Sequence, residues 1–228
     1  MNICFIENET VKVLSKQEYE SLCRDAKVIR SGKVLELANG DFLKLYRVKR
    51  VISSAIFYPY SKRFYHNAVQ LRCLGIATVD AKRLLRIPSI KRSAVLYAPL
   101  PGVTLRDFAQ DRGLSQSMAE QIGIFIAKLH SNGIYFRSLS LNNIIYTESG
   151  ELGLIDFADM KIHGKPLSPH KRLRNFRHLF GNVKDFSYLD VANKTYLVEH
   201  YLSTLNVVNG TSWVNKLWEI AAHSDKQA

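Results

Sequence analysis

The segment most informative about the architecture is Tyr135-Phe-Arg-Ser-Leu-Ser-Leu-Asn-Asn143-Ile-Ile-Tyr-Thr-Glu-Ser-Gly-Glu-Leu-Gly-Leu-Ile-Asp156-Phe-Ala-Asp159. Residues 143–146 and 152–155 have the pattern of two strands, and Glu148-Ser-Gly150 has the pattern of the turn between them. A short hairpin brings its two ends side by side, so we expect the amide of Asn143 near the carboxylate of Asp156. Both groups offer oxygen atoms, the ligands that Mg²⁺ prefers, and bound Mg²⁺ commonly also contacts substrate phosphates. The hairpin therefore predicts a magnesium site.

This stretch resembles the catalytic and metal-binding loops of protein kinases. Arg137-Ser-Leu-x-x-x-Asn143 is similar to the kinase motif H-R-D-L-x-x-x-N, and Asp156-Phe-Ala158 is similar to D-F-G. The resemblance implies that Asn143 and Asp156 bind the metal ion and that Arg137 braces the loop. The chain departs from the kinase pattern at two positions, because Phe136 replaces the histidine and Ser138 replaces the catalytic aspartate.

The serine at position 138 bears on the expected rate. A kinase aspartate accepts the proton of the substrate hydroxyl, whereas Ser138 is a poor base at neutral pH. Phosphoryl transfer depends mainly on positioning and charge stabilisation, so loss of the base is expected to slow the reaction by roughly 10²–10⁴-fold. Asp159 is a candidate replacement for the base. The alternative interpretation of Asp159 is a solvated or helix-capping residue.

Upstream of this stretch, the sequence indicates a small sheet with one helix. The expected elements are strands at residues 27–37, 41–47 and 94–97, a turn at residues 38–40 and a helix at residues 61–74. Lys44 alternates with Leu43 and Leu45 along its strand, so we expect its amine on the face opposite to these leucines. The segment Ala98-Pro-Leu-Pro-Gly102 then interrupts regular structure, as a connector between two lobes would.

The kinase resemblance assigns nucleotide-binding roles to four residues of this half. Lys44 corresponds to the lysine that holds the α- and β-phosphates of ATP, and Ala98 and Leu100 lie in the connector that borders adenine. Asn67 stands where a kinase glutamate pairs with that lysine. No acidic residue occurs from Phe42 to Val79, so the usual lysine–glutamate pair cannot form, and no G-x-G-x-x-G motif precedes Lys44.

Downstream of the connector, the pattern is mostly helical. Helices are expected at residues 104–111, 115–132, 171–179, 192–205 and 212–222. Strands with one helix, a connector, and then helices around one hairpin follow the order of a two-lobed protein-kinase-like fold. We therefore predict an α+β protein with an N-lobe at residues 1–97, a hinge at 98–103 and a helical C-lobe at 104–228 that carries the catalytic and metal-binding loops.

The chain resembles most closely the bacterial lipopolysaccharide-core kinases that act on heptose or Kdo, and their compact, tRNA-modification-associated and RIO-like relatives, with a degenerate catalytic loop. The resemblance covers about residues 27–179 and includes Leu74-Gly-Ile76, Leu100-Pro-Gly-Val-Thr-Leu105 and the basic run Arg172-Leu-Arg-Asn-Phe-Arg-His178. It implies an ATP- and Mg²⁺-dependent phosphotransferase that acts on a sugar hydroxyl of the inner core. The expected location is the cytoplasm, peripheral to the inner face of the inner membrane.

The net charge of +12 is concentrated in two segments without acidic residues, 42–79 and 161–180. Such fields attract polyanions, which include nucleotides, nucleic acids and the anionic glycolipid expected as acceptor. A generally basic surface with no specific ligand is the alternative. The sequence has no apolar run of membrane-spanning length. Its three cysteines show no metal-binding spacing, and we expect them to be reduced thiols.

Two further classes of function remain open at this point. Ser138 and Asn67 also fit a pseudokinase, which would bind nucleotide, or only a partner protein, as a scaffold in envelope biogenesis. A nucleic-acid-binding module would rest on charge alone, because the sequence contains no recognisable motif for reading DNA or RNA. We therefore do not expect nucleic acid as a partner.

Overall fold

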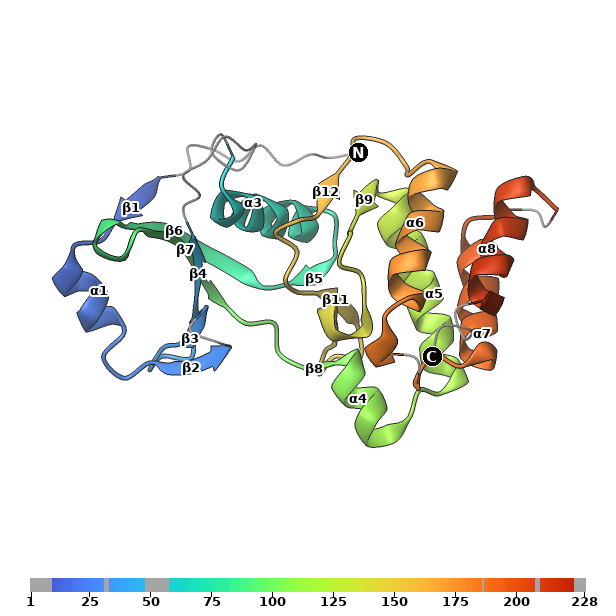
Figure 1. The fold of residues 1–228 in the computed structure, drawn as a ribbon, viewed down its shortest axis with the longest axis horizontal. Coiled ribbons are helices and arrows are strands. Elements are labelled where there is room, and N and C mark those ends of the chain that lie inside the picture. Colours follow the sequence, from blue (N-terminus) through green and yellow to red (C-terminus); the bar gives the residue numbers. More distant parts are fainter. Residues whose placement is uncertain (1–9, 31–32, 48–57, 186, 208–209, 224–228) are drawn as a thin grey trace. The chain divides into compact units, whose positions relative to one another are not determined.

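The computed structural model describes residues 10–30, 33–47, 58–185, 187–207 and 210–223. The chain divides into two compact units. The N-terminal unit contains Asn2–Leu100 together with Asp156–Asp159, and the C-terminal unit contains Pro101–Ile155 and the residues from Met160 onward. The first is rich in antiparallel strands and the second is mostly helical, which confirms the predicted α+β class (Figure 1).

The N-terminal unit is built on a six-stranded sheet. Its strands are β1 (Val11–Val13), β2 (Lys27–Arg30), β3 (Val34–Glu36), β4 (Phe42–Arg47), β6 (Asp80–Ile87) and β7 (Arg92–Ala98). Their order is β1-β6-β7-β4-β3-β2, and neighbouring strands are antiparallel except for the parallel pair of β1 and β6. The unit also contains α1 (Lys16–Leu22), α3 (Tyr60–Cys73), the short strand β5 (Ala77–Thr78) and a 3₁₀ turn, η1 (Pro88–Ile90).

The two faces of this sheet pack against different helices. One face forms a hydrophobic core with partly buried Tyr19 and Leu22 of α1; its buried members are Leu14, Leu35, Leu37, Leu43, Leu85, Ile87 and Ala94. On the other face α3 packs against β4, β6 and β7. The side chains that α3 buries are Ser61, Phe64, Ala68 and Leu71. The spacing of the last three is that of one helical face.

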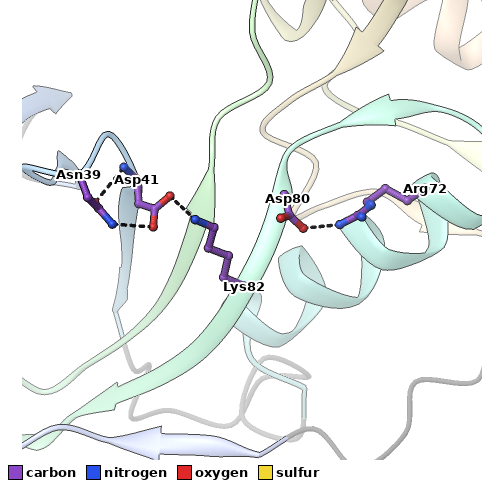
Figure 2. Close-up of polar contacts among 5 residues, drawn as sticks. All are labelled: Asn39, Asp41, Arg72, Asp80 and Lys82. Carbon is purple, nitrogen blue, oxygen red and sulfur yellow. Dashed lines mark hydrogen bonds and ion pairs between the residues drawn. The ribbon is translucent and has the colours of Figure 1, made fainter.

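Polar contacts hold the turn before β4 and the end of α3 (Figure 2). Asn39 donates to Asp41 Oδ2 over 3.0 Å and accepts from the Asp41 amide over 3.1 Å. Lys82 of β6 lies 2.6 Å from the other oxygen of Asp41, whose side chain is buried. Arg72, in the last turn of α3, pairs with Asp80 at the start of β6. The contacts of Asp41 connect the turn before β4, the strand that carries Lys44, to β6.

The C-terminal unit consists of five helices, short strands and 3₁₀ turns among the described residues. The helices are α4 (Leu105–Arg112), α5 (Gln116–Ser131), α6 (Pro169–Phe180), α7 (Val191–Thr204) and α8 (Ser212–His223). The short elements are β8 (Val103–Thr104), β9 (Ile134–Tyr135), η2 (Leu141–Asn143), β10 (Ile144–Tyr146), β11 (Leu152–Leu154), β12 (Lys161–Ile162) and η3 (Val183–Asp185). β10 pairs antiparallel with β8 and with β11, and β12 pairs antiparallel with β9.

Close helix packing and side-chain caps organise this unit. α5 lies along α7, and at Gly123 an added Cβ would meet the Leu197 carbonyl oxygen at 2.2 Å. Ser115 caps α5 by accepting from the Met118 amide over 3.2 Å, and Asn132 ends the helix. These are the ends that the sequence predicts for this helix.

Several elements differ from the sequence predictions. The strand expected at residues 27–37 is two antiparallel strands, because β2 and β3 pair with each other and Arg30 faces Val34. The sequence also gave no expectation of β1, α1 or β6. The first two are short. In β6 a register shift between Ala81 and Arg83 interrupts the strict alternation by which strands are recognised.

Two findings concern the cysteines and the character of the helices. Cys73 is disulfide-bonded and Cys23 is free, so the expectation of reduced thiols is wrong for Cys73. Disulfides are rare in cytosolic proteins, so the disulfide of Cys73 does not support the expected cytoplasmic location, which stays a prediction. Among the helices that the structure describes, none combines the length and the apolar character needed to cross a membrane.

Candidate functional site

Lys44 lies on the α3 side of the sheet. Its neighbours Leu43 and Leu45 pack into the opposite core, which agrees with the predicted alternation. The Lys44 ammonium lies 5.1 Å from the ring centre of Phe64 and 5.9 Å from that of Tyr46, and its side chain is 15% exposed. The aromatic rings therefore confine the amine and attract its charge.

The carboxylate partner of Lys44 is Asp156. Lys44 Nζ donates to Asp156 Oδ1 over 2.5 Å, and the Asp156 side chain is 46% exposed. Asp156 has a left-handed backbone with φ of +56°. This conformation costs a non-glycine residue about 1–3 kcal/mol, and such strain is concentrated at functional sites. The lysine that the sequence singles out for phosphate binding thus contacts the aspartate singled out for metal binding.

Two contacts fix the backbone directly after Asp156. The Phe157 ring stacks on Phe64 of α3, with ring centres 4.7 Å apart and planes 13° apart. Asn67, also on α3, donates its side-chain amide to the Phe157 carbonyl over 2.8 Å. Asn67, at the position of the kinase glutamate, therefore binds the main chain that carries Asp156. The charge that neutralises Lys44 comes from Asp156 itself.

Tyr46 is a member of this site that the sequence prediction missed. Its hydroxyl is buried and has no hydrogen-bond partner among the residues that the structure describes. Burial first, then the charges of Asp156 and Tyr97, raises the pKa of Tyr46 well above its usual value of 10, so the group stays a neutral donor. Its place two residues after Lys44, on the same face of β4, is the sequence signal that would have identified it.

The C-terminal unit contains Asn143 and Ser138. Asn143 Nδ2 donates to the Ser138 carbonyl over 2.7 Å, and its amide oxygen has no hydrogen bond to any described residue. The hairpin has the predicted form: Ile144 pairs with Leu154, and the Ile155 amide donates to the Asn143 carbonyl over 3.0 Å. An amide oxygen at the end of this ladder suits a hard cation.

A buried hydrogen-bonded chain holds the start of the loop that carries Ser138. Asn175 of α6 donates to the Phe136 carbonyl over 2.8 Å, so its amide oxygen must accept from His130 Nε2, 3.2 Å away. The Nδ1 atom of His130 then accepts from the Tyr201 hydroxyl over 2.9 Å, which in turn accepts from Arg172 over 3.0 Å. The chain runs without a break from a guanidinium to the loop backbone.

This series of hydrogen bonds from Arg172 to the Phe136 carbonyl requires a neutral His130 imidazole. His130 is fully buried, and its burial, reinforced by the charge of Arg172, lowers its pKa to about 3. A protonated His130 would present a second N–H to the Tyr201 hydroxyl and break the chain. His130 thus supports the loop through its hydrogen bond to Asn175.

A buried carboxylate holds the other end of the loop. Asp185, which is fully buried, accepts from the Leu141 amide over 3.2 Å and from Arg106 Nε over 2.7 Å. Arg106 supplies the opposite charge that a buried carboxylate requires. Residues 136–143 are thus fixed at Phe136 and at Leu141. Between these two points Arg137 and Ser138 are exposed, whereas Leu139 and Ser140 are buried.

The remaining predicted site residues lie partly in the C-terminal unit and partly in the N-terminal unit. Arg137 and Ser138 are exposed in the turn after β9. In the N-terminal unit, Ala98 ends β7, Leu100 is half-buried beyond it, and Asp159 is half-buried with one carboxylate oxygen fully buried. Within the described ranges, no three His, Cys, Asp or Glu side chains form a metal cluster.

The chain was compared with known protein families and with curated proteins. No family model matches it, and no curated protein matches it. The inferences about function therefore rest on the residues themselves and on the resemblance described above.

Proposed function

We propose that the chain is an ATP- and Mg²⁺-dependent phosphotransferase with a two-lobed protein-kinase-like fold, acting on a sugar hydroxyl of the lipopolysaccharide inner core. The observation that carries this proposal is the contact of Lys44 with Asp156, a lysine on a strand and a strained aspartate directly after a hairpin. Both residues were selected from the sequence for binding one ligand, Mg²⁺-ATP.

Each residue has a role in this proposal. Lys44 holds the α- and β-phosphates, Asp156 and Asn143 are the metal ligands, and Ala98 and Leu100 border adenine. Bound Mg²⁺-ATP supplies the phosphoryl group and neutralises the charge that develops on it. Without nucleotide, Lys44 and Asp156 neutralise each other. With Mg²⁺-ATP bound, Lys44 would pair with a phosphate and Asp156 would pair with the cation.

The Ser138 position implies a slow enzyme. A serine orients an acceptor hydroxyl by hydrogen bonding but does not take its proton at neutral pH. Asp159 remains the candidate for a replacement base, and Arg137 for a brace of the exposed turn. The fixed backbone at Phe136 and Leu141 supports positioning as the main contribution of this loop.

The acceptor is the least constrained part of the proposal. An anionic glycolipid fits the basic segments 42–79 and 161–180, and peripheral binding at the inner face of the inner membrane fits the same charge. The proposal therefore includes a cytoplasmic location for the protein.

A pseudokinase scaffold in envelope biogenesis is the second candidate function. It is favoured by Ser138 at the base position and by the direct pairing of Lys44 with Asp156, which leaves each residue satisfied without nucleotide. Such a protein would bind nucleotide or a partner protein without turnover.

Phosphate transfer from γ-labelled ATP to lipopolysaccharide-core oligosaccharide tests the proposal. The wild type should transfer label only with Mg²⁺, Asp156→Asn should abolish transfer, and Ser138→Asp should raise the rate by roughly 10²-fold or more. If the wild type gains thermal stability with Mg²⁺-ATP but transfers no label, the scaffold function replaces the enzyme.

A further inference from the structure

The segment that runs from β12 to α6 in the C-terminal unit (Figure 1) carries several basic residues. We call Lys161, His163, Lys165 and Lys171 the basic cluster. Lys171 Nζ lies 3.0 Å from His163 Nε2. Burial first, and then the charges of Lys171, Lys161 and Lys165, lowers the pKa of His163. Lys171 thus contacts the imidazole directly, and the charges of Lys161 and Lys165 also act on it.

The basic cluster has no neutralising partner within the described part of the chain. The sequence contains no acidic residue from Lys161 to Phe180, and none of the four side chains forms an ion pair with a described carboxylate. Lys171 also lies in the first turn of α6, where the helix dipole disfavours a cation. Like charges gathered without a counterion destabilise the fold, so this arrangement favours a bound anion.

The backbone that carries the cluster is held firmly. β12 pairs with β9, the His163 amide donates to the Gly133 carbonyl over 2.9 Å, and the Leu167 amide donates to the His130 carbonyl over 2.9 Å. Gly133 has a φ of +72°, and an added Cβ there would meet the carbonyl oxygens of His163 at 2.2 Å and Lys165 at 2.4 Å. The backbone of residues 163–165 thus lies in direct contact with Gly133. Because this backbone is already held in place, ligand binding would cost little backbone entropy.

The basic cluster and the loop with Ser138 share one anchor. β9 pairs with β12 on one side and continues directly into Phe136, where the loop begins. His130 connects the two as well: its carbonyl accepts from Leu167, and its ring supports the Phe136 backbone through Asn175. A ligand bound by the cluster would therefore lie on the same rigid part of the C-terminal unit as the loop.

We propose that Lys161, His163, Lys165 and Lys171 form a binding site for a phosphate group carried by the acceptor. Three ammonium groups offer donors to the phosphate oxygens, and His163 becomes a further cationic donor when it takes up a proton beside the bound anion. Assigning this phosphate to the acceptor rests on the proposed function. The binding of phosphate itself does not.

The titration of His163, followed by NMR of its ring proton, tests the site directly. We expect inorganic pyrophosphate, at constant ionic strength and without Mg²⁺, to raise the pKa of His163 by about one pH unit. His163→Gln assigns the signal. Lys165→Gln and Lys171→Gln should reduce the response to pyrophosphate, whereas Lys216→Gln, which removes an exposed lysine of α8, should leave it unchanged.

Citrate provides the comparison that decides whether the site recognises phosphate. Its charge near neutral pH is close to that of pyrophosphate, but it carries carboxylates. A response of His163 to pyrophosphate and a weaker one to citrate supports the proposal. No response to pyrophosphate, an equal response to citrate, or a stronger response to single-stranded RNA at equal phosphate concentration would overturn it.

A second variant tests the rigid backbone, and vesicles identify the source of the phosphate. Gly133→Ala should displace the segment and weaken the response to pyrophosphate; if this protein does not fold, the two lysine variants still decide the question. Vesicles with phosphatidic acid, compared with phosphatidylserine at equal surface charge, distinguish a lipid phosphate from a soluble one, and either source supports the site. If His163 responds while the wild type binds no Mg²⁺-ATP, the phosphate site stands and the proposed function fails.

Discussion

The ammonium of Lys44 lies 2.5 Å from a carboxylate oxygen of Asp156, 112 residues further along the chain. The ammonium lies 5.1 Å from the ring centre of Phe64, which stacks on Phe157, and 5.9 Å from that of Tyr46, whose hydroxyl is buried. The site thus combines an ion pair, two stacked aromatic rings and a hydroxyl donor that has no partner among the described residues. Together they define what can be tested in the N-terminal unit without reference to the acceptor.

The buried hydroxyl of Tyr46 gives the first prediction. An unsatisfied buried hydroxyl costs about 1–3 kcal/mol, so Tyr46→Phe should raise the stability of the ligand-free protein by about 1 kcal/mol. If the hydroxyl donates to bound nucleotide, the same variant should weaken Mg²⁺-ATP binding several-fold. Urea denaturation and calorimetric titration measure the two effects.

Tyr201→Phe is the matched control for this change. The Tyr201 hydroxyl bonds both His130 and Arg172, so its removal leaves two buried partners unsatisfied and should destabilise the protein. A loss of stability in Tyr46→Phe as large as that in Tyr201→Phe would contradict the description of the Tyr46 hydroxyl as unpartnered within the described residues.

His130 predicts how stability depends on pH. An unfolded histidine takes up a proton below about pH 6.5, whereas burial keeps folded His130 neutral down to a pKa of about 3. Its contribution is therefore fully present above pH 6.5 and is lost as the pH falls through this window. We expect it to lower the free energy of unfolding by about 2 kcal/mol between pH 6.5 and pH 5.

Denaturant titrations across this range measure that effect. His130→Gln should flatten the pH dependence, while His170→Gln, which changes an exposed histidine of α6, should keep it. An unchanged pH dependence in His130→Gln would show that the imidazole is not held neutral in the folded state.

Asn175 should matter for turnover more than for nucleotide binding. Asn175→Ala removes the donor that holds the Phe136 carbonyl, so the loop with Ser138 loses one of its two supports. We expect kcat for phosphate transfer to fall about tenfold or more with little change in the affinity for Mg²⁺-ATP.

Asn193→Ala separates this effect from lost stability. The Asn193 side chain makes the same kind of bond, donating to the Leu114 carbonyl over 3.2 Å at the start of α7. This variant should lose stability and keep kcat. Equal losses of kcat in the two variants would rule out a positioning role for Asn175.

The packing of α5 on α7 predicts a cost for the smallest side-chain addition. Gly123→Ala places a methyl group 2.2 Å from the Leu197 carbonyl oxygen, a backbone atom that moves only with its helix. We expect a loss of about 1–3 kcal/mol in the free energy of unfolding, measured by urea denaturation. Gly164→Ala, where an added methyl group meets nothing within 4 Å, is the control, and a similar loss there would contradict the packing argument.

Local patterns in the sequence were sufficient to predict part of this protein. The ends of α5 follow from the cap at Ser115 and the stop at Asn132, and the β10–β11 hairpin follows from its alternation and its glycine turn. α1 also had a signal, since Ser15 and Glu18 form a capping box, but the sequence prediction passed over it. Each of these features depends on residues that are close together in the sequence, so it can be predicted without a structure.

Contacts between distant segments could not be predicted in the same way. No local pattern pairs Lys44 with Asp156, and nothing near His130 or Asp185 in the sequence indicates that they support one loop from opposite ends. Buried polar chains of this kind exist only once the helices have packed. The sequence therefore identified residues of the candidate site but not the supports that hold them.

Calorimetric titration of ATP into the wild type and Asp156→Asn, each with and without Mg²⁺, tests the central claim most directly. We expect the wild type to bind ATP more tightly with Mg²⁺, and Asp156→Asn, which keeps the shape and removes the charge, to lose this dependence on Mg²⁺. If the wild type binds no ATP at millimolar concentration with Mg²⁺, or if Asp156→Asn keeps the full effect of Mg²⁺, then Lys44 and Asp156 do not form a nucleotide site.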